Sequence, residues 1–474
     1  MNNTIFNLAK RVLLLLALVG ANAAWGGPTE AFWHDDAARG LSSEAPQLSE
    51  YRALTLDTAA VTSYLQAAYK NGSAVRIDLP QPDGGFAEFT LIDSGTLPAD
   101  LQRKYPEIIT LKGSDSQGRQ VRVDVSPNGF NAMVFDPAGI WVIRPEVIGH
   151  GDHYLSFKRA GLSVPGGTGK CEVHEQDIDP AGLNLVPGAE PMTETGTTRR
   201  VYRTAIAANN RYIAAVGGGT VVGGLAATTM ALNRVTQVYE YEMAIQLTLV
   251  PNNDLIMYPN AATDPFASNG TGVINNSTSV INAAIGVSNY DIGHVFTTGS
   301  GGVAGLRVVC GGSKARGTTG LGNPTGDAFY IDFVAHEMGH QFGGNHPFNG
   351  SLGNCSGGNR NGSTAYEPGS GSTIQSYAGI CSADDLQPHS DPFFHAISLQ
   401  EITSFTENAA TGGSCSANTP NSNNRPVIDP ASLPAGYTIP ARTPFVLSAS
   451  ATDPDAGDTP MYSWEEWDLG PQAP

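Results

Sequence analysis

The residues His336–His346 read HEMGHQFGGNH, and they are the most informative stretch of the chain. On a helix, side chains at positions i and i+4 lie on one face, so His336 and His340 can direct two imidazoles at one ion. Gly343 tolerates a positive φ, which lets the backbone leave the helix sharply and brings His346 back as a third ligand. Three protein ligands with a fourth position left open are typical of catalytic zinc sites, whereas structural sites are usually closed by four.

The residues around the motif favour a helix that ends at this point. Ala328–Ala335 (AFYIDFVA) is apolar enough for a buried helix start, and Gly343-Gly344 follows where the helix should stop. Glu337 stands beside the first histidine, where its carboxylate can accept a proton from a water molecule at the ion. The alternative, a helix that carries these histidines by coincidence, requires five fixed positions to agree by chance. We therefore predict a Zn²⁺ site with the three histidines as ligands and Glu337 as the catalytic base.

The pattern H-E-x-x-H-x-x-G-x-x-H resembles the zinc-binding signature of the metzincins. The chain up to about Pro420 is most similar to the secreted reprolysin-like zinc metalloproteases. This resemblance implies an α/β (α+β) catalytic domain with a twisted sheet, helices above a cleft and a small irregular lower part. It also implies endopeptidase activity on protein or peptide substrates.

Composition limits the other functions of the chain. A length of 474 residues with 41% hydrophobic residues allows about three domains with cores of their own. The net charge of −18, with only 26 lysines and arginines, gives nucleic-acid binding no electrostatic basis.

The N-terminus predicts export. Lys10-Arg11 precede the apolar run Val12–Val19, and Ala21-Asn22-Ala23 is a small-x-small cleavage site, so residues 1–23 read as a secretory signal peptide. The apolar run is too short to span a bilayer, although a retained anchor is the alternative. We expect a secreted, extracellular protein without a membrane anchor, in a compartment that permits disulfides.

Residues 24–198 are predicted to be a β-rich propeptide. Between Val75 and Pro145 the sequence alternates in strand fashion, with Pro-Asp-Gly-Gly and Ser-Pro-Asn-Gly turns, and it resembles the propeptides of reprolysin-like enzymes. Cys171 is the one cysteine of five outside the catalytic region, and its thiolate could fill the open zinc position. It is therefore the candidate cysteine switch by which the propeptide inhibits the enzyme. The alternatives are an incidental thiol or an intermolecular disulfide. The polar segment Pro180–Thr198 before Arg199-Arg200 reads as a cleavable linker.

Residues 199–420 are predicted to be the metzincin domain, with α/β patterning. We expect strands at Val201–Ala208, Met243–Val250 and Asp291–Thr297. We expect helices at Thr220–Tyr239, Gly272–Ile285 and Ser390–Phe405.

The Gly-rich stretch before the zinc helix matches the strand along which metzincins bind substrate. Main-chain hydrogen bonds along such an edge would hold an extended peptide above the metal. We assign this role to Ala304, Gly305 and Leu306, and an ordinary loop is the equal alternative.

Downstream, Ser372–Cys381 (STIQSYAGIC) resembles the turn that lies beneath the zinc in metzincins. Gln375 stands where that turn normally carries methionine, so a polar amide must find hydrogen-bond partners there or lose stability. Tyr377 keeps the position whose hydroxyl, in some metzincins, binds zinc or the developing oxyanion; a packed tyrosine is the alternative. His389 and His395 are predicted to be surface or capping residues, because three histidines already complete the protein ligands.

Family resemblance favours the disulfides Cys310–Cys415 and Cys355–Cys381, although sequence alone leaves three connectivities open. Residues 421–474 read as a linker and the start of an immunoglobulin-like β-sandwich, too short to be complete. Asp453, Asp455 and Asp458 can ligate structural Ca²⁺, or can form a solvated acidic turn.

Two functions are weighed at this stage, and the first is the leading interpretation. The first is a secreted zinc endopeptidase made as a zymogen. The second is a non-catalytic secreted binding or adhesion protein that keeps the fold, an idea motivated by Gln375 and the sandwich-like tail. Retention of Glu337 favours the enzyme, because a binding protein has no need of a catalytic base.

Overall fold

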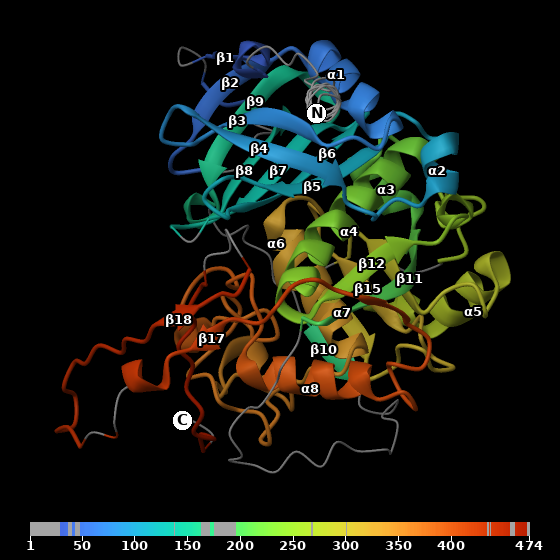
Figure 1. Ribbon diagram of the computed structural model, residues 1–474. Coiled ribbons are helices and arrows are strands. Elements are labelled where there is room, and N and C mark those ends of the chain that lie inside the picture. Colours follow the sequence, from blue (N-terminus) through green and yellow to red (C-terminus); the bar gives the residue numbers. More distant parts are fainter. Residues whose placement is uncertain are drawn as a thin grey trace, which may run out of the picture.

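The computed structural model describes residues 29–36, 40–42, 48–136, 138–162, 171–174, 196–266, 269–299, 301–433, 436, 438–455 and 460–471, with the main chain alone for 171–174. The predicted signal peptide and most of the predicted linker lie outside these residues. Two parts are stacked on one another in Figure 1: an N-terminal β-sheet above, and a mixed α/β part below.

The N-terminal part is a nine-stranded sheet with the order β1-β2-β9-β8-β7-β6-β5-β4-β3, in which all neighbours are antiparallel. Helix α1 begins after Asp57, whose carboxylate accepts a hydrogen bond from the Ala60 N–H and caps the helix. The elements are η1 (Thr29–Phe32), β1 (Trp33–Asp35), β2 (Arg52–Leu56), α1 (Thr58–Lys70), β3 (Val75–Pro80), β4 (Phe86–Asp93), α2 (Ala99–Lys104), β5 (Ile109–Ser114), β6 (Gln120–Ser126), β7 (Gly129–Phe135), β8 (Trp141–Val147), β9 (His150–Lys158) and η2 (Arg159–Gly161).

This sheet is covered on both faces, as the alternation along β6 explains. Val121 and Val123 belong to the apolar core that includes Val61 and Leu65 of α1. The intervening Arg122 and Asp124 point the other way, because successive strand residues alternate in direction. They meet helix α4 (Val221–Met243) of the lower part.

The lower part is a mixed sheet with the order β10-β14-β15-β13-β11-β12, and β16 pairs with β11. Its strands are β10 (Cys171–His174), β11 (Thr198–Ala208), β12 (Ile245–Leu249), β13 (Ile292–Thr297), β14 (Gly301–Gly305), β15 (Gly317–Gly320) and β16 (Ala417–Pro420). Its helices are α3 (Asn210–Val216), α4, η4 (Asn253–Ile256), η5 (Thr271–Val273), α5 (Ile274–Ile285), α6 (Asp327–Phe329), η6 (Tyr330–Ala335), α7 (His336–Gln341), η7 (Gly353–Cys355), η8 (Ser382–Asp384) and α8 (Ala396–Glu407).

Several element boundaries differ from the sequence prediction, and two of these differences have a clear structural cause. Met243 ends helix α4 rather than beginning a strand, and Ala244 takes a left-handed C-cap conformation with φ 53°. Helix α8 begins six residues later than predicted, because the His395 ring caps it by accepting a hydrogen bond from the Ile397 N–H.

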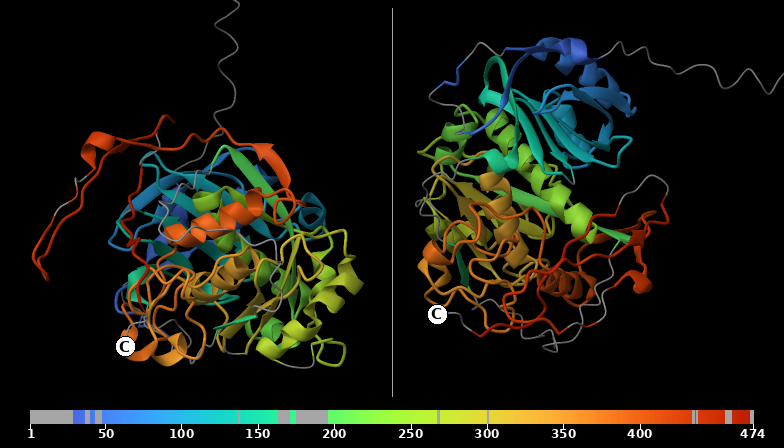
Figure 2. Two further views of the ribbon diagram at one scale, coloured as in Figure 1. Left: turned by 90° about the horizontal axis from the view of Figure 1, so that it is seen from below. Right: turned by 90° about the vertical axis from the view of Figure 1, so that its left-hand side faces the viewer.

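The two parts share one hydrophobic core. It joins Leu101, Met133 and Phe157 of the N-terminal part to Leu232 and Val235 of α4, among many others. Helix α4 therefore lies between the two sheets, which the right-hand view of Figure 2 shows.

The α4 interface also contains buried polar contacts. Glu240 accepts hydrogen bonds from Lys112 and Arg122 of the N-terminal sheet. Asn233 donates to the Asp124 carboxylate at 2.9 Å. The two cations satisfy the charge of Glu240, which would otherwise be costly to bury.

Disulfides join Cys310 to Cys415 and Cys355 to Cys381, which is the pairing that the family resemblance implied. Among the described residues, no single helix has the length and apolar character to cross a membrane. The bent pair α3–α4, with 83° between its helices, meets that test by length and composition only.

The tail after β16 contains little regular structure in its described part: β17 (Val427–Ile428), η9 (Pro430–Ser432) and β18 (Ala451–Thr452). Phe445 and Val446 are 67% and 91% exposed, so no packed sandwich forms around them. The immunoglobulin-like domain stays a prediction.

The described residues of the acidic turn in the tail do not support the predicted calcium site. The Asp455 carboxylate accepts two hydrogen bonds from Asn424, and Asp453 accepts one from the Asp455 N–H. Asp458 lies outside the described residues.

Candidate metal centre and active site

The site is built on a continuous helical run in which η6, a π-helical turn, leads into α7. The hydroxyl of Tyr239 on α4 donates to the Ala335 carbonyl at 2.8 Å, which ties this run to the core. The helix ends as the sequence predicts: Gly343 adopts φ 107°, and its N–H bonds to the His340 carbonyl at 2.8 Å. The chain then turns back toward the helix and delivers His346.

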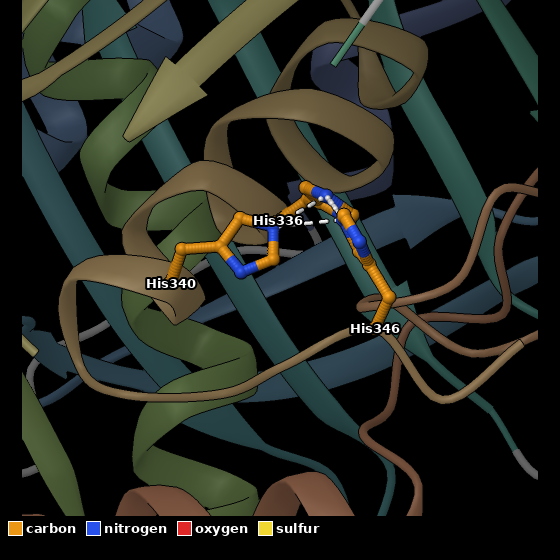
Figure 3. Close-up of side chains that lie close together, drawn as sticks. All are labelled: His336, His340 and His346. Atoms are coloured by element: carbon orange, nitrogen blue, oxygen red, sulfur yellow. Dashed lines mark hydrogen bonds between the residues drawn. The ribbon is translucent and has the colours of Figure 1, made fainter. Parts of the chain in front are cut away.

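The three histidines of the motif converge (Figure 3). The Nε2 atom of His340 lies 3.0 Å from Nε2 of His336 and 3.0 Å from Nε2 of His346, and the last two are 3.3 Å apart. All three side chains are buried, with exposures of 3% or less.

A backbone carbonyl orients each ring from behind. The Nδ1 atoms of His336, His340 and His346 lie 2.7, 2.6 and 2.6 Å from the carbonyls of Ile374, Gly344 and Asn359, respectively. Since a carbonyl only accepts, each Nδ1 carries the proton and each Nε2 presents a lone pair.

Burial keeps the rings uncharged at neutral pH. It lowers the pKa of His336 to about 4, against the weaker opposing effects of the Ile374 carbonyl and Asp332. Burial, followed by the charges of His346 and His336, holds the pKa of His340 well below its usual value, and burial followed by His336 does the same to the pKa of His346.

These features fit zinc. Three uncharged imidazoles with their lone pairs directed at one point cannot hydrogen-bond to each other, and they require a cation between them. Tetrahedral zinc, with Zn–N distances of about 2.0–2.1 Å, separates its nitrogen ligands by about 3.3 Å, close to the observed spacing.

Glu337 follows the ligand His336 in the zinc helix and is fully buried, at 0% exposure. It lies against strand β14, because a Cβ added to Gly302 would stand only 2.1 Å from its Oε1 atom. The absence of a side chain at Gly302 therefore makes room for the carboxylate between the zinc helix and strand β14.

The turn after Ile374 lies under the histidines, where the family resemblance placed it. The Gln375 Nε2 atom is 3.1 Å from the His340 Nδ1 atom and donates to the Gly344 carbonyl at 3.3 Å. Because that Nδ1 is itself a donor, only the contact with Gly344 is a favourable hydrogen bond. The Gln375 Oε1 atom is buried and has no hydrogen-bond partner among the described residues.

Tyr377 packs on the cluster from the same turn. Its ring centroid is 4.6 Å from that of His346 and 5.6 Å from that of His336, and the residue is 2% exposed.

Comparison with known families decides the assignment of this site. Residues 198–404 match the family model "Metallo-peptidase family M12B Reprolysin-like". They form a reprolysin-like metallopeptidase domain. Membership of this family implies zinc and a hydrolase that acts on peptide bonds.

Similarity to individual proteins is more distant. Among solved structures, metalloproteinase-II from Bacteroides fragilis is similar at a TM-score of 0.41 and 10% sequence identity, over 72% of this chain and 94% of that chain. Comparison with curated proteins gave no match.

The predicted substrate strand of the metallopeptidase domain is paired in this structure. Ala304 and Gly305 lie in β14, opposite Val173 and His174 of β10, and the two strands are parallel. Leu306 follows the strand and is 3% exposed. The main chain of Cys171 lies opposite Gly302, next to the Glu337 carboxylate. The Cys171 side chain lies outside the described atoms, so its role as a switch stays a prediction.

A pocket opens beside His336 in the metallopeptidase domain. Its walls come from the zinc helix, from the turn that holds Tyr377 and from the following segment: Leu321, Ala328, Asp332, Phe333, His336, Ser376, Tyr377, Ala378, Gly379, Ile380, Pro388, His389 and Ser390.

Sequence reasoning missed the polar contacts at this pocket. The His389 Nδ1 atom lies 2.7 Å from Asp332 Oδ2, and Arg159 of the N-terminal part donates to Asp332 Oδ1 at 2.7 Å. The only local signal was the spacing of Asp332, one helical turn before His336. Nothing in the sequence pointed to Arg159, which is 173 residues away from its partner.

Proposed function

We propose that the chain is the secreted zymogen of a zinc endopeptidase. The observation that carries the proposal is the convergence of three uncharged imidazoles, each fixed by a backbone carbonyl, together with a buried Glu337 next to His336 in the sequence. The two disulfides support export, because disulfides persist in oxidising compartments.

In the proposed reaction, His336, His340 and His346 hold the metal, and Glu337 moves the proton. When bound, zinc supplies a Lewis acid that polarises the peptide carbonyl and lowers the pKa of water. The Glu337 carboxylate accepts a proton from the attacking water and then delivers it to the nitrogen of the departing amine. Its burial against Gly302 excludes bulk water from this proton transfer.

Substrate would lie along β14 as an added strand. An extended peptide paired with Ala304 and Gly305 places its backbone carbonyls close to Glu337, since β14 runs directly past that residue. Tyr377 would stabilise the oxyanion through its hydroxyl, a role supported by the packing of its ring on His336 and His346.

Latency follows from the same strand. Residues 171–174 pair with the strand that substrate would use, so a precursor in this conformation excludes substrate from the edge. A thiolate from Cys171 would additionally take the open metal position.

The test compares zinc content and casein hydrolysis before and after limited proteolysis near Arg200. We expect zinc in both forms and hydrolysis only after trimming. Zinc binding without hydrolysis, unchanged by Glu337→Gln, would instead identify a non-catalytic binding protein.

A second experiment tests the switch itself. Cys171→Ser should be active without cleavage, and a mercurial, which captures thiolates, should activate the intact wild type but leave the variant unchanged. If Cys171→Ser is as silent as the wild type while the trimmed form is active, the propeptide inhibits through strand pairing alone.

A further inference from the structure

The pocket beside His336 has an unusual polar end. Its walls include the apolar side chains of Leu321, Phe333 and Ile380, but Asp332 and His389 also line it. The His389 Nδ1 atom donates to Asp332 Oδ2 at 2.7 Å, and its buried Nε2 atom has no hydrogen-bond partner among the described residues. Apolar walls together with the acceptors of Asp332 and Ser390 suit an amphipathic cationic side chain.

A guanidinium group is already bound at this end of the pocket. Arg159 Nη2 donates to Asp332 Oδ1 at 2.7 Å, and Arg159 Nη1 donates to the Ser390 carbonyl at 2.6 Å. Both acceptor residues line the pocket, and Arg159 is only 8% exposed. A planar guanidinium suits such a fork of acceptors, since it has five donors and no acceptor of its own.

Arg159 belongs to η2 of the N-terminal part, so it would leave with the propeptide. Its departure affects two neighbouring carboxylates differently. Asp327 lies 3.6 Å from Arg159 Nε, but Arg234 of α4 also acts on it: burial raises the pKa of Asp327, and the charges of Arg159 and Arg234 oppose that rise. Asp332 has ion-pair contacts only with Arg159 and His389 among the described residues. Loss of Arg159 therefore leaves Asp332 without a permanent cation.

We propose that, once the propeptide has left, this site binds the arginine or lysine side chain of a substrate residue close to the scissile bond. The proposal rests on the proposed protease function and names its substrate class. Arg159 then fills in the precursor the position that a basic substrate side chain takes in the active enzyme.

The position of Asp332 along the helix suits a long side chain. Asp332 precedes the ligand His336 by four residues of the same helical run, which is about 6 Å along the axis. From a backbone held at the metal, an arginine side chain can cover such a length, with its methylene groups against Leu321 and Phe333.

The test uses the trimmed, zinc-loaded protein and peptides that differ at one position. Arginine, citrulline and norleucine are placed in turn at each position on either side of the cleaved bond. Citrulline keeps the shape of arginine without its charge, so the ratio of kcat/KM for arginine over citrulline isolates the ion pair. A charge-assisted hydrogen bond implies a ratio of about ten to one hundred at one position.

Two variants assign the ratio to a residue. Asp332→Asn should bring the ratio close to one. Asp327→Asn, which alters a neighbouring carboxylate that does not line the pocket, should keep it. The citrulline comparison on the wild type needs no variant, so it tests the proposal even if either variant folds poorly.

The outcomes are separable. Hydrolysis of all three peptides with equal kcat/KM would overturn the arginine site while the protease function stands. A preference that survives in Asp332→Asn would also overturn it. If the trimmed protein hydrolyses no peptide at all, the proposed function fails first, and Arg159 is only an anchor for the propeptide.

Discussion

Replacement of Gln375 by methionine should stabilise the metallopeptidase domain. The side chain is fully buried, its Oε1 atom has no hydrogen-bond partner among the described residues, and its Nε2 atom makes one long bond of 3.3 Å to the Gly344 carbonyl. Removal of a buried unsatisfied acceptor gains about 1–3 kcal/mol, whereas loss of the bond to Gly344 costs about 0.5–1.5 kcal/mol. The Gly344 carbonyl also keeps its bond from His340 at 2.6 Å.

The net expectation is a gain of about 1 kcal/mol, because methionine has a similar volume and adapts to irregular space. For a domain of this size, that gain raises the midpoint of thermal unfolding by about 2–4 °C. Calorimetry of the metal-free protein measures it, and resistance of the zinc-loaded protein to a chelator gives a second readout. We expect slower zinc loss, because the floor beneath His340 becomes apolar.

Gln341→Met is the matched control. This second buried glutamine lies on the zinc helix, with Oε1 bound to His294 Nδ1 at 2.8 Å and Nε2 bound to the Gly293 carbonyl at 2.8 Å. The same substitution breaks both bonds and leaves both partners buried, so it should destabilise by about 2–5 kcal/mol. A Gln375→Met variant that loses stability as Gln341→Met does would refute the reasoning, because Gln375 would then be as well satisfied as Gln341.

Three further predictions concern the site and the interface. Glu337→Gln should retain zinc but lose about two to four orders of magnitude in peptide hydrolysis, measured as kcat/KM; near-normal activity would exclude Glu337 as the base. His346→Ala should lower zinc occupancy in metal analysis, and unchanged occupancy would point to another third ligand. Burial raises the pKa of Asp124 to about 7, so the folded chain holds a proton between about pH 4 and 7 that the unfolded chain has lost. The free energy of unfolding should therefore fall as the pH rises through this window, by up to about 1.4 kcal/mol per pH unit. Urea unfolding of Asp124→Asn should not show this fall. If the unfolding free energies of the wild type and the variant depended on pH in the same way, the burial argument would be contradicted.

The zinc motif could be predicted from sequence because its geometry is local. Four-residue spacing fixes His336 and His340 on one helical face, and the turn at Gly343 depends only on the backbone freedom of glycine. The expected helix start at Ala328–Ala335 was likewise found, but its π-helical turn was not foreseen. That turn lies where the core meets the helix, as the bond from Tyr239 to Ala335 shows, and no pattern in one segment encodes such a contact.

The contacts between the N-terminal part and the lower part could not be predicted either, because they too join segments that are distant in the sequence. Alternation in β6 predicted a strand with one apolar face, but it did not say that Arg122 and Asp124 would be buried against α4. Charged residues in a strand usually indicate a face that is exposed to solvent. Here that face is buried, because helix α4 covers it. The disulfide pairs came from the family resemblance, because spacing alone left three connectivities equal.

The shared core around α4 has a consequence for activation. A cut between residues 174 and 198 removes a covalent tether but none of the contacts that bury Leu232 and Val235 under the N-terminal sheet. The two fragments then form a bimolecular complex, whose population depends on protein concentration, whereas the uncut chain holds them together at any concentration. For the zymogen proposed above, proteolysis would thus only permit release of the N-terminal part, and dilution would complete it. Freshly cut enzyme should gain activity as it is diluted, at a rate set by dissociation rather than by the activating protease.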